Sequence, residues 1–248
     1  MSGHSKWSTI KRKKAANDAK KGAAFTRISK DITLAAREGG GDPEMNASLR
    51  LAIKAAKAAN MPSNNIDRAI KKGTGDLPGM KYEDYVYEGY GPGGVAIMID
   101  VMTDNKNRTV PEIRHLMDKN GGKLGEPGCV NWMFHKKGTI LIKNIDCDEE
   151  MLLELSLENG AEDFETDKDF YIITVEPDNF EKLLVFLEKQ NYKIESSEIS
   201  LVPENTVKIS SKDAEQLLNL LDLLEDNEDI QKVYSNFDLD DSELESII

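Results

Sequence analysis

The sequence changes character near Gly79, and this change constrains the fold more than any other feature. Residues 1–75 are rich in Ala and Lys and contain almost no run with the period of two that is typical of a strand. Beyond Gly79, β-rich runs alternate with runs of helical periodicity. The sequence therefore predicts a helical domain followed by α+β structure.

Three helices are expected in the helical domain. Phe25, Ile28 and Ile32 recur with the spacing of one buried helix face, and the glycines at 39–41 end that run. Asp42 is expected to cap a second helix that follows directly, and its apolar face begins at Met45.

A shorter third helix is expected to begin at Pro62, with Ile66 and Ile70 facing inward. The glycines at 73 and 75 end it. These three helices predict a small bundle.

The middle of the remaining chain has the β-α-β-β-α-β order of a ferredoxin-like unit. Its expected elements are strands over 139–143, 161–166, 170–175 and 193–202, and helices over 148–159 and 179–190. The flanking segments complete a second such unit, with strands over 93–102, 128–134, 206–210 and 230–237, and helices over 107–120 and 212–224. The predicted fold class is α+β: an N-terminal three-helix domain followed by two ferredoxin-like α+β domains, one inserted into the other.

The predicted domain limits follow from this order. They are 1–75 for the basic helical domain, 76–134 with 204–238 for the discontinuous ferredoxin-like domain, 135–203 for the inserted acidic ferredoxin-like domain, and 239–248 for an acidic tail.

Charge is separated along the chain. Residues 1–75 carry 16 Lys and Arg against 6 Asp and Glu, although the whole chain has a formal net charge of -13. Residues 146–248 carry 7 basic and 30 acidic side chains. Because the Debye length is about 8 Å at physiological ionic strength, distant acids do not cancel the attraction of the basic end for a polyanion. The basic end is therefore expected to hold nucleic acid.

The densest cationic run is at 11–14, and a second stripe recurs at spacings of four and three on the second helix. A solvated Lys-rich face is the alternative interpretation. Trp7 could stack on a base or pack on the bundle. Gly22 is expected to interrupt a helix through the first basic residues, so a mobile arm that orders on its ligand is equally plausible. The predicted nucleic-acid-binding residues are Lys6, Trp7, Lys11, Arg12, Lys13, Lys14, Lys20, Lys21, Arg27, Lys30, Arg50, Lys54 and Lys57.

The polar run at 103–109 lies between an expected strand and an expected helix. It can serve as a turn with Asn105 or Asn107 as the N-cap, or as a loop that contacts RNA or protein. The residues of this second contact loop are Asn105, Lys106, Asn107 and Arg108.

The remaining motifs favour structural roles. The run at 89–94 matches G-x-G-x-x-G, but it leads into a strand rather than a helix, so a turn is expected instead of a dinucleotide site. Cys129 and His135 lie on or beside an expected strand and are interpreted as packing residues. No His or Cys pair has the spacing of a zinc site. We expect no catalytic residues, no metal and no cofactor, and the protein is not predicted to be an enzyme.

The sequence also indicates a compartment. It has no apolar run long enough to span a membrane, no apolar secretion signal at its start, and two cysteines, a number too small for a disulfide framework. A cytoplasmic protein without a membrane partner is expected, as a monomer or weak oligomer.

Several long motifs resemble the YebC family. They lie at 1–7, 11–14, 60–73, 87–96, 103–109 and 121–125, and the similarity spans essentially the full length. The resemblance implies a three-domain fold with one discontinuous domain, and a cytoplasmic, non-enzymatic bacterial regulator of gene expression. Members are described as DNA-binding transcriptional regulators, and others, including mitochondrial relatives, as translational activators at the ribosome.

The predicted function is a nucleic-acid-binding transcriptional regulator that contacts DNA through its basic N-terminal domain. The alternative is a ribosome-associated translation factor that contacts rRNA or tRNA. The sequence lacks a recognition helix with base-reading side chains at its start, and a backbone-reading patch serves either partner. A protein-only adaptor and a hydrolase are the two other classes considered, and no candidate catalytic site supports the latter.

Overall fold

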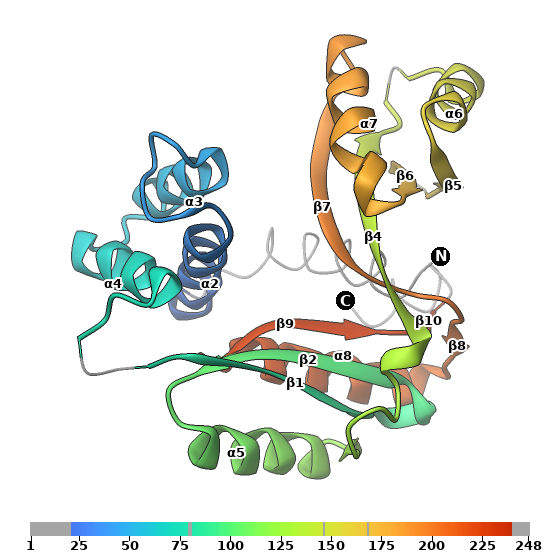
Figure 1. Ribbon diagram of the computed structural model, residues 1–248. Coiled ribbons are helices and arrows are strands. Elements are labelled where there is room, and N and C mark those ends of the chain that lie inside the picture. The colour runs from blue at the N-terminus through green and yellow to red at the C-terminus, as the bar shows by residue number, and fades with distance from the viewer. Residues whose placement is uncertain (1–20, 79–80, 146, 168, 240–248) are drawn as a thin grey trace. The chain divides into compact units, whose positions relative to one another are not determined.

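The computed structural model describes residues 21–78, 81–145, 147–167 and 169–239, with only the backbone at 21–24 and 211. Over these residues the chain forms seven α-helices and antiparallel sheets (Figure 1). They divide into two compact units, of which one comprises Trp132–Thr206 with Asn236–Asp238 and the other comprises the rest. The predicted α+β class is confirmed, whereas the predicted limits of the three domains stay predictions.

The helical segment belongs to the larger unit. It contains α2 (Lys21–Gly39), α3 (Ala47–Ala58) and α4 (Ser63–Thr74). Ile32, Leu49 and Ile66, one from each helix, are buried in a common apolar cluster, and Phe25, Ile28 and Ile70 pack against it. The spacing of apolar residues therefore predicted the buried faces of α2 and α4 correctly.

The start of α3 differs from the sequence prediction. Asn46 is the N-cap, and its side-chain oxygen accepts a hydrogen bond from Leu49 N at 3.0 Å. Asp42 instead accepts from Glu44 N in a turn before the helix. Met45 therefore precedes the helix and is 85% exposed, so its predicted place on the apolar face was wrong.

Helices α2 and α4 approach closely at Gly73. A Cβ atom at this position would lie 2.3 Å from the backbone oxygen of Thr33 and 2.9 Å from the Ala36 Cβ. Only glycine permits this spacing, and the Thr33 hydroxyl also donates to Ala69 O on α4 at 3.2 Å. This contact fixes α4 against the long helix.

The larger unit also contains a four-stranded antiparallel sheet in the order β3-β1-β2-β9. Its strands are β1 (Glu83–Tyr90), β2 (Ala96–Thr103), β3 (Lys123–Leu124) and β9 (Ile230–Ser235). Ile97 on β2 pairs with Ser235 on β9, so strands far apart in the sequence are neighbours. The helices α5 (Lys106–Lys119) and α8 (Ser211–Asp226) pack against each other. The larger unit is discontinuous in sequence, because residues 132–206 of the smaller unit interrupt it. The strands of its sheet and these two helices follow in the order β1-β2-α5-β3-α8-β9, which differs from the predicted β-α-β-β-α-β order.

Two strand predictions for this sheet were wrong. Residues 128–133 form a loop and the 3-10 turn Asn131–Met133 rather than a strand, and Phe134 begins a strand of the smaller unit. The predicted strand at 206–210 is reduced to β8 (Val207–Lys208), which is outside the sheet. Strand β1, which the sequence did not predict, lies between β3 and β2 in this sheet.

A buried carboxylate explains why the first of these segments is a loop. Glu88 on β1 is 6% exposed, and its side chain accepts hydrogen bonds from the backbone N–H groups of Gly128, Val130 and Asn131 at 2.7, 2.8 and 2.8 Å. These donors therefore point at a side chain instead of a neighbouring strand. Burial alone would raise the pKa of Glu88, but the three hydrogen bonds outweigh it, and the pKa lies below its usual value.

The smaller unit has the predicted β-α-β-β-α-β order. Its strands are β4 (Phe134–Lys143), β5 (Ala161–Thr166), β6 (Phe170–Val175) and β7 (Ile194–Pro203), in the order β5-β6-β4-β7 with antiparallel neighbours. The helices α6 (Glu149–Glu158) and α7 (Pro177–Lys189), labelled in Figure 1, share a core with Ile140 and Ile142 of β4, as Leu152, Leu183 and Leu187 are buried with them. A short strand, β10 (Phe237–Asp238), also belongs to this unit.

No helix among the described residues is both long enough and apolar enough to cross a membrane.

Candidate nucleic-acid interface

The cationic stripe on α3 is held in place by its cap. The Asn46 amide donates to Ala35 O at 2.7 Å and to Gly40 O at 2.8 Å, so the start of α3 is tied to the end of α2. Leu49 and Ala56 then face the core. At about 100° per residue, Arg50 and the two lysines beyond it project roughly a third of a turn away from that buried face.

The two lysines of this stripe carry available charge. Lys54 and Lys57 are exposed and have no hydrogen-bond or ion-pair partner among the described residues. The helix contains no Asp or Glu. Arg50 differs, because its guanidinium donates to Pro43 O at 2.8 Å and holds the turn before the helix. It also donates to Glu44 O at 3.3 Å, and neither of these backbone acceptors neutralises its charge.

The basic residues of α2 have two different surroundings. Arg27 is exposed and has no partner among the residues described. Lys30 is half-buried and donates a hydrogen bond to the backbone oxygen of Glu225 on α8. Farther along α2, Arg37 forms an ion pair with Asp84 on β1. Of the two predicted α2 contacts with a described side chain, Arg27 is thus the more available.

Helix α4 adds cations that the sequence analysis did not single out. Arg68 and Lys71 are exposed. Their positions could have been predicted, because Ile66 and Ile70 face inward and leave these residues on the outer side. Lys71 also lies in the last turn, where a cation is favoured by the helix dipole, so a structural role accounts for it equally well.

The predicted second contact loop begins at the N-cap of α5. The Asn105 side chain accepts from Arg108 N at 3.2 Å, which confirms the turn-and-cap interpretation for Asn105. Lys106 lies over the ring of Tyr85, 4.6 Å from its centroid. Asn107 is exposed. The structure does not test their contact with RNA or protein, which remains a prediction.

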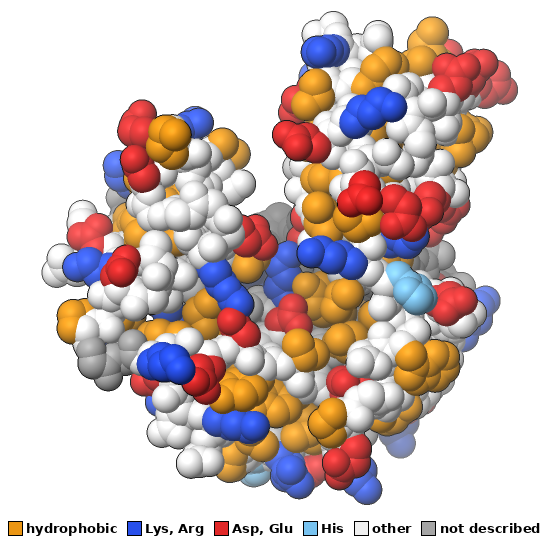
Figure 2. Space-filling view, in the orientation of Figure 1, with side chains coloured by type: hydrophobic (Ala, Val, Ile, Leu, Met, Phe, Trp, Pro, Cys, Tyr) orange, Lys and Arg blue, Asp and Glu red, His pale blue; other side chains and the backbone are white. Residues whose placement is uncertain are grey.

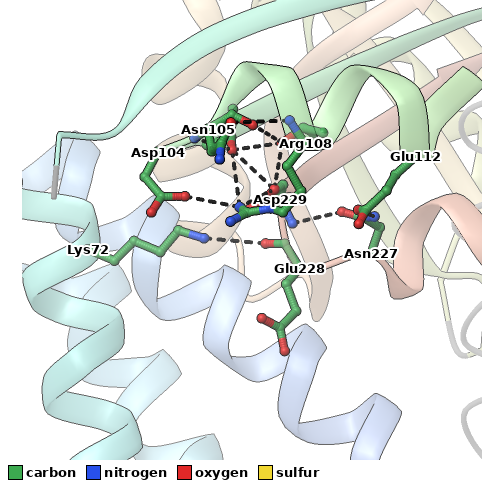
Figure 3. Close-up of polar contacts among 10 residues, drawn as sticks. Lys72, Asp104, Asn105, Arg108, Glu112, Asn227, Glu228 and Asp229 are labelled. Atoms are coloured by element: carbon green, nitrogen blue, oxygen red, sulfur yellow. Dashed lines mark hydrogen bonds and ion pairs between the residues drawn. The ribbon is translucent and has the colours of Figure 1, made fainter.

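Arg108 is engaged by two carboxylates (Figure 3). Its guanidinium lies 3.0 Å from Asp104 and 2.8 Å from Asp229. Asp229 is 7% exposed and also accepts from the hydroxyls of Thr109 at 2.7 Å and Thr103 at 3.1 Å. Burial would raise the pKa of Asp229, but these hydrogen bonds hold it below its usual value. The carboxylates in turn raise the pKa of Arg108. Its charge therefore mainly balances a buried acid.

A cavity of about 730 Å³ lies beside this network, between the helical segment and the sheet of the same unit. Lys72 of α4 lines it, and its ammonium donates to Glu228 O at 3.3 Å (Figure 3). The same ammonium lies 4.8 Å from the centroid of the Tyr82 ring. Burial lowers the pKa of Lys72, and the nearby Asp229 only partly opposes this. Four cations and four carboxylates line the cavity, so it presents no simple site for an anion.

Part of the predicted interface lies outside the described residues. This part comprises Lys6, Trp7, Lys11, Arg12, Lys13, Lys14 and Lys20. The side chain of Lys21, at the start of α2, is likewise not described.

The glycine-rich run behaves as a turn. Strand β1 ends at Tyr90, the 3-10 turn Pro92–Gly94 follows, and β2 starts at Ala96. Gly93 and Gly94 have φ of 71° and 76°, a backbone region that glycine adopts readily. The run thus enters a strand, as the sequence analysis expected, and opens no phosphate-binding helix.

Cys129 and His135 have separate structural surroundings. Cys129 lies in the loop held by Glu88, and burial, followed by the nearby Glu88 charge, raises the pKa of its thiol, which disfavours the nucleophilic thiolate. His135 Nε2 lies 3.4 Å from the Glu204 carboxylate. Among the described residues, no group of His, Cys, Asp or Glu has the arrangement of a metal site.

Two family models match the chain. The model described as the TACO1/YebC protein N-terminal domain matches residues 5–76, and the model described as the TACO1/YebC second and third domain matches residues 82–237. The chain therefore belongs to the TACO1/YebC family, and the resemblance found in the sequence is confirmed.

Similar proteins from other organisms match this chain over nearly its full length. A protein of Halothermothrix orenii is 54% identical over all of this chain and 99% of its own, and one of Pelotomaculum thermopropionicum is 53% identical over 97% of this chain and all of its own. Each is named "Probable transcriptional regulatory protein". A solved structure from Aquifex aeolicus, described as a conserved hypothetical protein, is 44% identical with a TM-score of 0.73, covering 90% of this chain and 93% of its own. The names of the two relatives from Halothermothrix orenii and Pelotomaculum thermopropionicum support a role as a regulator.

Proposed function

We propose that this protein is a regulator of gene expression that binds the phosphate backbone of nucleic acid through its basic N-terminal domain. The observation that carries the proposal is the outer face of α3, where Lys54 and Lys57 are exposed and unpaired among the described residues of a helix without acids. Free ammonium groups release counterions when they contact phosphates, and this release drives binding.

The chemistry of α3 favours backbone contacts over base reading. Its sequence, ASLRLAIKAAKA, contains no Asn or Gln, the side chains that read adenine in a groove. Lysine contacts phosphate as a point charge and carries little sequence information. The basic segment before α2 would add further phosphate contacts, chiefly through its run at 11–14.

Two targets are compatible with a backbone-reading surface. The printed names of the relatives support DNA and transcription as the first assignment. Ribosomal RNA or tRNA, and so translation at the ribosome, is the second, because A-form RNA is recognised largely through its shape, phosphates and 2′-hydroxyls. In either case we infer a cytoplasmic monomer or weak oligomer that works without a catalytic step.

Crosslinking in cells followed by sequencing of the bound nucleic acid tests the proposal. The variant Lys54→Glu/Lys57→Glu is expected to lose most of its crosslinks. The matched control, Lys182→Glu/Lys189→Glu on α7, makes the same change of charge at exposed lysines of the acidic unit and is expected to keep them. Equal loss in both variants, or no loss in either, would overturn the role of α3.

The same experiment separates the two targets. Recovery of promoter DNA supports transcription, and recovery of rRNA or tRNA supports translation. A parallel variant with Glu at positions 11–14 tests the preceding basic segment. If that variant crosslinks as well as the unchanged protein, the segment at 11–14 does not contribute to binding. If the α3 variant also crosslinks as well as the unchanged protein, a protein-only adaptor is indicated instead of a nucleic-acid-binding regulator.

A further inference from the structure

The outer face of α6 exposes apolar side chains beside acids. Leu152 and Ser156 are buried and fix the orientation of the helix on its sheet. Met151, Leu153 and Leu157 are 58, 36 and 50% exposed on a helix of only ten residues. Figure 2 shows orange and red side chains next to each other at the position where Figure 1 places α6. The outer face of an amphipathic surface helix carries mainly charged and polar side chains, so three exposed large apolar residues on one short helix are unusual.

The acids form one row between the apolar residues. Glu150, Glu154 and Glu158 recur every four residues and therefore follow one line on the helix. At about 100° per residue, Leu153 and Leu157 lie along one side of this line. Met151 lies on the other side, beside Glu150 at the N-terminal end of the row. The face therefore presents a row of negative charge, with an exposed apolar side chain on each side of it, and would be complementary to a cationic partner.

This row is unfavourable for the isolated helix. Glutamates spaced by four residues repel each other, and Glu158 lies in the last turn, where the helix dipole disfavours an anion. The last turn contains no basic residue. None of the three carboxylates forms an ion pair with a described residue, and two cations of this unit, Lys137 and Lys143, are paired with other acids. A cationic partner would relieve this repulsion.

The charge of the unit limits what could occupy the face. Residues 132–206 carry 7 Lys and Arg against 18 Asp and Glu. Nucleic acid would be repelled, and a second copy would place one glutamate row against another. Helix α7 shows the contrast, since it contains Lys182 and Lys189, whereas α6 contains no basic residue.

We propose that the α6 face, defined by Glu150, Glu154, Glu158 and the flanking Met151, Leu153 and Leu157, docks a basic amphipathic helix of another protein. Lysines or arginines of the partner at spacings of four residues face the glutamate row, and its apolar residues cover the exposed leucines. This interaction is independent of the proposed nucleic-acid contact, because it uses a different unit and the opposite charge.

The test measures binding of a probe to the full chain. The probe is a labelled synthetic helix of about five turns, with Lys in one row and Leu along both edges. Its affinity is expected to fall about tenfold or more in Glu154→Lys/Glu158→Lys and about fivefold in Leu153→Gln/Leu157→Gln. The matched control, Glu181→Lys/Glu188→Lys on α7, makes the same change of charge and is expected to bind within about twofold of the unchanged protein. Denaturant unfolding of each variant verifies that it is folded.

Three results would overturn the proposal. Equal weakening by the α6 and α7 variants would mean attraction to the acidic unit in general. Insensitivity to the leucine substitutions would mean that no apolar contact forms. Tighter binding after removal of residues 1–20, together with competition by a peptide of those residues, would identify this chain's own basic segment as the occupant. A photo-crosslinker at position 151 in cells should, on the proposal, join a Lys- and Arg-rich segment of another protein.

Discussion

Helix α3 and the loop at 105–108 both carry cations that the sequence identified as candidate nucleic-acid contacts, yet their surroundings differ. Lys54 and Lys57 on α3 have no partner among the described residues. Arg108 in the loop lies between Asp104 and Asp229. The comparison teaches that the availability of a charge depends on its neighbours in space. Asp229 is 121 residues away from Arg108 along the chain.

The largest effect is expected on stability, at the loop. Asp229→Ala leaves Arg108 without its closest acid, and it leaves the hydroxyls of Thr103 and Thr109 without their acceptor. Removing one partner of a buried charge pair typically costs 3–5 kcal/mol, and we expect about 2–3 kcal/mol here because Arg108 is partly exposed and keeps Asp104. Urea unfolding measures it, and a loss below about 0.5 kcal/mol would show that the network is not structural.

The second prediction concerns binding, on α3. Lys54→Glu/Lys57→Glu is expected to weaken nucleic-acid affinity by about 30- to 100-fold at low salt, because two phosphate contacts become repulsive. Arg108→Gln should change affinity by less than about threefold, because its charge is already balanced within the protein. Titration of one labelled duplex with each folded variant provides the measurement. A larger loss from Arg108→Gln than from the α3 variant would reverse the comparison.

A third prediction uses the loop that Glu88 holds. Glu88→Gln retains at most an acceptor oxygen and loses charge-assisted hydrogen bonds, so we expect a loss of about 1–2 kcal/mol near neutral pH. Because the folded pKa of Glu88 is lowered, its contribution is complete above the usual value of 4.5 and is lost as pH falls through the folded pKa. Unfolding of both proteins over this pH range should show their stabilities converging in acid. A constant difference would contradict the assignment.

The smallest effect is expected just before α3. Met45 is 85% exposed, so Met45→Gln should change the free energy of unfolding by less than about 0.5 kcal/mol. Asn46→Ala at the next residue should cost about 1–2 kcal/mol, since it removes the cap of α3. Equal effects at the two positions would mean that the helix starts earlier than the structure shows.

Local patterns in the sequence predicted much of the fold. Apolar spacing located α2 and α4, and the alternation of strands and helices located every element of the smaller unit. Strand β1 was missed because its acids and tyrosines, EDYVYEGY, give no clear apolar alternation. The run at 128–134 was predicted as a strand from its local apolar pattern. The carboxylate of Glu88, which holds residues 128–131 as a loop, lies about 40 residues earlier in the chain, where a local pattern does not show it.

The candidate site could be predicted only in part. The spacing of Arg50, Lys54 and Lys57 placed them on one exposed face because helix geometry is local. No local pattern showed that Asp229 neutralises Arg108, or that Lys30 reaches the backbone of Glu225. Contacts between distant segments depend on the tertiary fold, so a run of charge in the sequence is an upper limit on the charge available to a ligand.

The most direct test of the central claim is the salt dependence of binding to a DNA duplex. Each phosphate contact contributes about −0.9 to the slope of log K against log salt concentration. Neutralising the two lysines in Lys54→Gln/Lys57→Gln should therefore reduce the magnitude of the slope by about 1.8, whereas Arg108→Gln should leave it nearly unchanged. An unchanged slope in the α3 variant would contradict the account.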